Sequence, residues 1–213
     1  MKRLVFLSFI FIILNGQWSM VNSENILDVF TSMPDSIFPL LTAKNRHDMV
    51  DFYKNKMEAK VRNRLGDYAL LDTLTEGYLR LTPSKASTVE MKLMETEDST
   101  NVICLIQTVK APVQDSSVRF YDSEWRRLFW LELPVASTSD FFEEVPDSVS
   151  KEMQFVQRSI DDLRLIAVSV SPDEPVFTMQ LSVDELAKEE KKIAERHLLS
   201  VRYRWTGKDF VKE

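Results

Sequence analysis

The sequence predicts an α+β fold: a largely antiparallel β-sheet with flanking helices, arranged either as one unit or as two related lobes. Three observations lead to this prediction. Apolar and polar residues alternate, at the period of two that is typical of strands, through much of the chain after Met57. Short polar or proline-containing turns separate these stretches, and such connections favour antiparallel hairpins because parallel strands need long crossovers. Amphipathic stretches with helical spacing interrupt the alternation.

The helical stretches begin close to the N-terminus. Ile26, Phe30 and Met33 fall on one face of a short helix. A second helix of about three turns is expected to begin at Asn45, a good N-cap residue, and to end near Met57. Two more are expected over residues 149–163 and 184–198, and the last of these is rich in Lys and Glu. Their apolar faces are expected to pack on the protein's own sheet.

Strands are expected between the helices, separated by turns such as Thr82-Pro83-Ser84 and the run from Ser171 to Pro175. The strand stretches are residues 59–65, 68–74, 77–81, 88–95, 101–109, 117–121, 127–133, 164–170, 176–181 and 199–205.

The first 23 residues have the pattern of a secretory signal peptide. Lys2 and Arg3 precede an apolar run of about 11 residues, which is too short to span a membrane. Small residues before the cut favour cleavage between Ser23 and Glu24. We therefore expect a signal peptide at 1–23 and a single α+β domain at 24–213; an uncleaved N-terminal anchor is the alternative.

Composition narrows the class of protein further. The formal net charge of −6 becomes more negative when Lys2 and Arg3 are removed, and such a surface repels nucleic acid. Cys104 is the only cysteine, so the chain has no internal disulfide and no cysteine at the cut to carry a lipid. Cys104 lies in a continuous apolar run and is expected to be a buried core residue. After residue 23, the chain contains no other apolar run of comparable length, so no transmembrane span is expected.

Motifs for cofactors and catalysis are missing from the sequence. The chain has four glycines, and none forms the glycine-rich loops that bind nucleotide phosphates, so no cofactor is expected. His47 and Asp51 share one helix face, but two ligands do not make a metal site. His197 is expected to cap the end of the last helix. We therefore predict no catalytic, cofactor-binding or metal-binding residues.

A candidate ligand surface combines arginines with aromatic residues. Ser117-Val118-Arg119-Phe120 is similar to Ser200-Val201-Arg202-Tyr203, which suggests a faint internal duplication or a coincidence between two ordinary strands. Strand alternation would place the arginines of these segments on outer faces, and aromatic side chains beside arginines can hold sugars or partner proteins. Core packing is the other interpretation of the aromatic residues. The candidate residues are Arg119, Tyr121, Trp125, Arg202 and Arg204.

Several strings resemble a family of exported proteins from Bacteroidales, domain of unknown function 3256. The resemblance implies export in a Gram-negative bacterium, and hence the periplasm; it implies no activity and no catalytic residues. It extends from about Phe30 to Phe210. The strings that carry it are Ser32-Met33-Pro34-Asp35-Ser36, Pro39-Leu40-Leu41-Thr42 with Asn45-Arg46-His47-Asp48, Val89-Glu90-Met91-Lys92-Leu93, Asp115-Ser116-Ser117-Val118-Arg119-Phe120-Tyr121 followed by Trp125, and Arg204-Trp205-Thr206-Gly207-Lys208-Asp209-Phe210.

Together these features predict a non-enzymatic binding or accessory domain of the cell envelope, whose partner is an envelope protein or a glycan. The first alternative is an envelope hydrolase that acts on glycan or peptide through Asp and Glu carboxylates, since 33 acidic residues offer many pairs. A structural envelope subunit is the second alternative.

Overall fold

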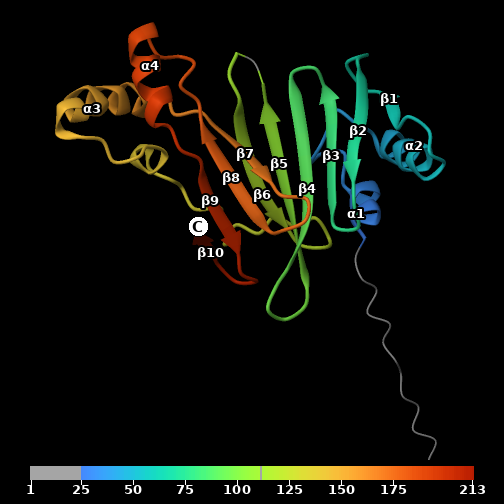
Figure 1. Ribbon diagram of the computed structural model, residues 1–213. Coiled ribbons are helices and arrows are strands. Elements are labelled where there is room, and N and C mark those ends of the chain that lie inside the picture. The colour runs from blue at the N-terminus through green and yellow to red at the C-terminus, as the bar shows by residue number, and fades with distance from the viewer. Residues whose placement is uncertain (1–24, 111) are drawn as a thin grey trace, which may run out of the picture.

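The computed structural model describes residues 25–110 and 112–213, which form two stacked antiparallel sheets with helices at both ends (Figure 1). The predicted α+β class is therefore confirmed. The predicted signal peptide and its cut between Ser23 and Glu24 lie outside the described residues. In chain order the elements are α1 (Ile26–Ser32), α2 (Ala43–Lys54), β1 (Lys60–Arg62), β2 (Tyr68–Leu74), β3 (Tyr78–Ser84), β4 (Ser87–Glu95), β5 (Asn101–Val109), β6 (Asp115–Tyr121), the 3-10 helix η1 (Thr138–Phe141), α3 (Asp147–Asp161), β7 (Ile166–Val170), β8 (Val176–Leu181), α4 (Lys188–His197), β9 (Val201–Trp205) and β10 (Phe210–Lys212).

The larger sheet is a six-stranded meander in which β1 to β6 are neighbours in sequence order. Its centre is the long β4–β5 hairpin, paired without a break from Ser87 opposite Val109 to Glu95 opposite Asn101. Side chains of these two strands are buried on both faces, because each face is covered by another layer. The smaller sheet has the order β10-β9-β8-β7, and Figure 1 shows it crossing in front of β4 to β6.

The layers enclose two hydrophobic cores on opposite faces of the six-stranded sheet. One core lies between this sheet and helices α1 and α2, and it contains Phe30, Met91 and Leu105. The other lies between the two sheets and reaches α3 and α4; Phe120 and Phe177 meet there with ring centroids 6.5 Å apart. Alternation along β4 and β5 sends successive side chains into different cores.

Strand β7 is an edge strand whose free amides are occupied by side chains of the larger sheet. The N–H groups of Ile166, Val168 and Val170 donate to Asp115 Oδ1 at 3.2 Å, Ser116 Oγ at 2.8 Å and Glu90 Oε2 at 3.0 Å. Every second amide of an edge strand faces away from its own sheet, so these three bonds cover the edge and fix the sheets together.

Several of the expected boundaries are wrong by a few residues, and the start of α2 and the end of β3 show why. Helix α2 begins after Thr42, not at Asn45: Thr42 Oγ1 accepts from the Asn45 N–H at 3.1 Å, and Asn45 Oδ1 accepts from the Thr42 N–H at 3.1 Å, so both form a capping box. Strand β3 continues through Pro83, where a turn was expected. The β3–β4 register shifts between Leu81 and Ser84, and a proline is tolerated at such an irregularity.

The strand expected at 127–133 is also wrong. Arg127 makes one isolated bridge to Tyr121, and no ladder follows it within the described part of the chain. Leu131 is buried in the core between the sheets, while Phe129 and Trp130 are exposed. The apolar spacing of this stretch thus reflects an extended loop that packs on a core without pairing to a strand.

Candidate functional site

The three arginines of the predicted ligand surface lie on two outer faces of the molecule. Arg119 is exposed on β6, and Arg202 and Arg204 point outward from β9, because the residues between them face the core between the sheets. Both β9 arginines bind Glu213, at 3.2 Å and 2.6 Å, and Arg204 also lies 2.8 Å from Glu174. The similar segments 117–120 and 200–203 thus lie in different sheets. In each segment the apolar residues face the core between the sheets and the arginine faces outward, and the arginines of the two segments do not meet.

The two aromatic residues of that predicted surface are buried. Tyr121 is 6% exposed and Trp125 is 7% exposed, and their ring centroids lie 5.3 Å apart in the core beneath the N-terminal helices. The indole N–H of Trp125 donates to Ser32 Oγ at 3.4 Å, at the end of α1. Neither ring offers a free face to a ligand.

Exposed aromatic side chains lie a few residues further along the chain. Phe129 is 80% exposed, Trp130 is 71% exposed and Val135 is 78% exposed, all on the loop between β6 and η1. The sequence pattern did not indicate their exposure, since the alternation there predicted a strand. The sequence shows several aromatic residues between Tyr121 and Trp130, but it does not show which of their rings face solvent.

Trp130 forms one wall of a groove of about 490 Å³, hereafter the Trp130 groove. The indole of Trp205 lies at its base, held by a 2.7 Å hydrogen bond to the carbonyl of Glu95. Acidic side chains at the rim include Asp98 and Asp122. Hydroxyl groups of Thr96 and Thr100 donate to Asp98 and lower the pKa of its carboxyl, so Asp98 is a charged acceptor at neutral pH. The groove combines an exposed ring with oriented acceptors.

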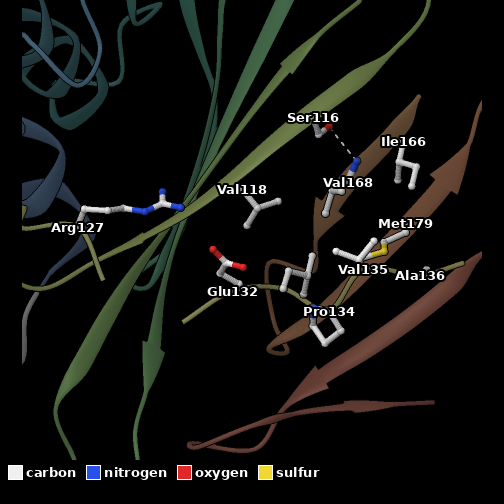
Figure 2. Close-up of a pocket in the computed structure, with 11 residues that line it drawn as sticks. Ser116, Val118, Arg127, Glu132, Pro134, Val135, Ala136, Ile166, Val168 and Met179 are labelled. Carbon is white, nitrogen blue, oxygen red and sulfur yellow. Dashed lines mark hydrogen bonds between the residues drawn. The ribbon is translucent and has the colours of Figure 1, made fainter. Parts of the chain in front are cut away.

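A second hollow, the inter-sheet cavity, has a volume of about 270 Å³ and lies where β6 meets β7 and β8 (Figure 2). Figure 2 shows the hydrogen bond from the Val168 N–H to Ser116 at one end, and the guanidinium of Arg127 directed toward Val118 and Glu132 at the other. Most of the remaining lining is aliphatic. No sequence pattern marked this cavity, because its lining comes from three strands and a loop far apart in the chain.

Groups able to hold a metal are not gathered in the described residues. Among them, no cluster of three or more His, Cys, Asp or Glu side chains has the arrangement of a metal site. His47 is exposed on α2, and His197 Nδ1 lies 2.8 Å from Glu143 Oε1 at the end of α4. Cys104 is fully buried, as predicted, and burial raises the pKa of its thiol.

Across residues 25–110 and 112–213, the helices are all too short or too polar to cross a membrane.

Comparison with known proteins agrees with the resemblance noted in the sequence. No curated protein matches the chain. A solved structure, "Structure of a domain of an uncharacterized protein from Porphyromonas gingivalis W83", is 27% identical, with a TM-score of 0.74 over 88% of this chain and 97% of that one. The family described as protein of unknown function DUF3256 matches residues 18–210. The chain therefore belongs to the DUF3256 family.

Proposed function

We propose that this protein is a non-enzymatic binding or accessory domain of the cell envelope, and that the Trp130 groove binds a glycan. The single observation that carries the proposal is the exposure of Trp130, 71%, at the wall of a groove with acidic and hydroxyl side chains. Large aromatic side chains are normally placed where their apolar area is covered, so an exposed pair such as Phe129 and Trp130 favours a binding role.

Sugar rings fit the chemistry of this groove. A pyranose presents an apolar face of C–H groups that can stack on an indole, and hydroxyl groups around its edge that donate to carboxylates. Trp130 supplies the ring, and Asp98 supplies an acceptor through Oδ2, since its hydrogen bonds with Thr96 and Thr100 use Oδ1. Asp122 also lies at the rim, but both of its oxygens already accept from Arg126 or Glu124. Trp205 is fixed by its bond to Glu95, so the groove is largely preformed, which lowers the entropic cost of binding.

The binding experiment uses soluble peptidoglycan fragments and a panel of β-linked oligosaccharides, titrated into the purified protein by calorimetry. We expect saturable binding that weakens at least about tenfold in Trp130→Ala, as loss of a stacked ring implies. Phe155→Ala is the matched control, because Phe155 is 60% exposed on α3 and does not line the groove. Each mixture is also analysed for cleaved products after prolonged incubation.

Two outcomes would contradict the binding proposal. Absence of binding by all the sugars, or equal binding by the wild type and Trp130→Ala, would remove the groove as a glycan site. Cleavage of a substrate that a single Asp98→Asn or Asp122→Asn change abolishes would instead favour a hydrolase.

The envelope location is a separate part of the proposal. Its support is the charged start and short apolar run of residues 1–23 and the exported character that the family resemblance implies. We expect mass spectrometry of the protein purified from its own cells to find Glu24 at the N-terminus in the periplasmic fraction. An intact Met1 would contradict export with cleavage.

A further inference from the structure

Arg127 lines the inter-sheet cavity and directs its guanidinium toward Val118 and Glu132 (Figure 2). Its Nη1 atom is shielded from solvent and has no hydrogen-bond partner among residues 25–110 and 112–213. A buried charged N–H without an acceptor is costly, and native structures normally supply one from protein, water or ligand. Nη1 has no accessible surface of its own, so an acceptor in the cavity would reach the guanidinium through its other nitrogen atoms.

The guanidinium also lies near two aromatic rings. Its central carbon lies 5.7 Å from the ring centroid of Tyr121 and 5.9 Å from that of Phe129, both within the range of cation–π contacts. Tyr121 is itself buried against Trp125. These contacts restrict the side chain of Arg127, which is half-buried.

The rest of the cavity favours apolar groups. Its walls include the aliphatic side chains of Val118, Leu133, Ile166 and Met179. The Ser116 hydroxyl is already occupied by the Val168 N–H and by Thr108. A ligand body that lies along these walls gains by burying hydrocarbon and finds few polar partners other than Arg127.

From these features we propose that the inter-sheet cavity binds a small apolar carboxylate, with the carboxylate on Arg127 and the hydrocarbon body against Val118, Ile166 and Met179. An arginine binds a carboxylate through charge-assisted hydrogen bonds, which are stronger than neutral ones. The cavity volume of about 270 Å³ lies at the small end for ligand sites, so the ligand has a short chain or a single side chain.

Glu132 is the competing carboxylate. It lines the same cavity, is exposed, and forms no ion pair with Arg127 within the described residues, although Figure 2 shows its carboxylate turned toward the guanidinium. A bound anion would lie near Glu132 and be repelled by it. Removing the charge of Glu132 should therefore tighten binding of an anion, while removing Arg127 should take away the advantage of a carboxylate over a neutral group.

The test uses two pairs of probes, each a carboxylate with its neutral amide: hexanoate with hexanamide, and N-acetyl-leucine with N-acetyl-leucinamide. The first pair represents a free fatty acid and the second a peptide C-terminus. Each is titrated into the ¹⁵N-labelled purified protein, and shifts of the Val168 and Ala136 amide signals report binding in the cavity. We expect at least one carboxylate to bind about tenfold more tightly than its amide, a preference typical of a charge-assisted bond.

Variants then test the assigned roles. Arg127→Gln should remove the preference for carboxylate over amide, and Glu132→Gln should strengthen carboxylate binding. Arg126→Gln is the matched control, since Arg126 loses the same charge one residue away but is 71% exposed and pairs with Asp122 and Glu124. It should bind like the wild type. Because the comparison of carboxylate with amide is made on the wild type, it stands even if Arg127→Gln does not fold.

The proposal is overturned if both carboxylates bind no better than their amides, or if the shifted signals lie away from the cavity. It is also overturned if Arg127→Gln and Arg126→Gln weaken binding equally, which would indicate only a general effect of surface charge. The Trp130 groove plays no part in this test, so the two proposals succeed or fail separately.

Discussion

Arg46 is the largest of the fully buried side chains, and it joins the two N-terminal helices. Its guanidinium donates to the carbonyl of Met33, which follows α1, and at 2.6 Å to the carbonyl of Leu41, which precedes α2. Asp35 Oδ1 lies 3.1 Å away. Burial lowers the pKa of Arg46 and hydrogen bonding to Asp35 opposes that shift, so the buried charge depends on this partner.

Replacing Arg46 by methionine should lower the free energy of unfolding by about 3 kcal/mol, because two buried carbonyls lose their donor and Asp35 loses its closest buried cation. Arg64→Met is the control: Arg64 binds the other oxygen of Asp35 at 2.8 Å but is half exposed. That change should cost less than about 1 kcal/mol, as for surface ion pairs. Urea denaturation of both variants measures the difference, and equal losses would contradict a special role for Arg46.

Glu90 is a second buried charged residue, 6% exposed, at the contact between the sheets. Burial raises the pKa of its carboxyl, while the hydrogen bond from the Val170 N–H opposes the rise. As the pH increases above its ordinary pKa of about 4.5, the unfolded chain loses this proton before the folded protein does. The contribution of Glu90 to the free energy of unfolding therefore falls with increasing pH until the folded carboxyl also ionises.

Glu90→Gln should remove this pH dependence, since glutamine keeps an oxygen for the Val170 N–H and does not ionise. The stability of the variant relative to the wild type should increase from pH 4 to pH 7, with a slope of at most about 1.4 kcal/mol per pH unit. Chemical denaturation at several pH values measures it. Glu95→Gln, at the exposed end of the same strand, provides the control for a general charge effect; a relative stability of Glu90→Gln that is flat or falls with pH would refute the assignment.

At the scale of elements, the hydrogen bonds that cover the free edge of β7 hold the two sheets together. Ser116→Ala removes the acceptor of the buried Val168 amide, which should lower stability by about 1–2 kcal/mol and speed hydrogen exchange at that amide. Ser117→Ala is the matched control, because Ser117 is adjacent on β6 but exposed. If both variants exchange at Val168 as the wild type does, the side chain does not protect the edge.

Sequence pattern predicted the elements that bury a regular face, and it failed where burial is irregular. The boundaries of β2, β5 and β8 match the expected strands, because turn residues border a continuous apolar or alternating run at both ends. The stretch 127–133 shows the opposite case. Leu131 is buried while Phe129 and Trp130 are exposed, and a period-two pattern alone does not distinguish a strand from a loop lying on a core.

The candidate sites depend even more on tertiary packing, which a local sequence pattern does not show. Arg119, Arg202 and Arg204 are outward-facing as strand alternation implies, but only the stacking of the sheets determines that they lie on different faces. The inter-sheet cavity unites Ser116 and Arg127 with Met179, which is far away in the chain. Such a site depends on the packing of one sheet on the other, and no local pattern of residue types encodes it.

At the scale of the whole molecule, the central hairpin connects the two cores. Met91 of β4 faces the core beneath the helices, and Met94 of the same strand faces the core between the sheets; Leu105 and Cys104 of β5 divide in the same way. If β4 and β5 separate from one core, the apolar side chains that these strands contribute to the other core also become exposed. We therefore expect the described residues to unfold as one cooperative unit, in keeping with the predicted single domain at 24–213.

Hydrogen exchange in a pair of core variants tests this cooperativity. Phe30 is fully buried beneath the helices and Phe177 is fully buried between the sheets, so changing either to alanine should cost about 3–5 kcal/mol. In one cooperative unit, Phe30→Ala should speed the slowest exchange of β8 amides as much as that of β3 amides, although β8 lies in the other sheet. Phe155→Ala, on the exposed face of α3, should change neither. Exchange in β8 that stays at the wild-type rate in Phe30→Ala would show instead that the smaller sheet and its core are an independent folding unit.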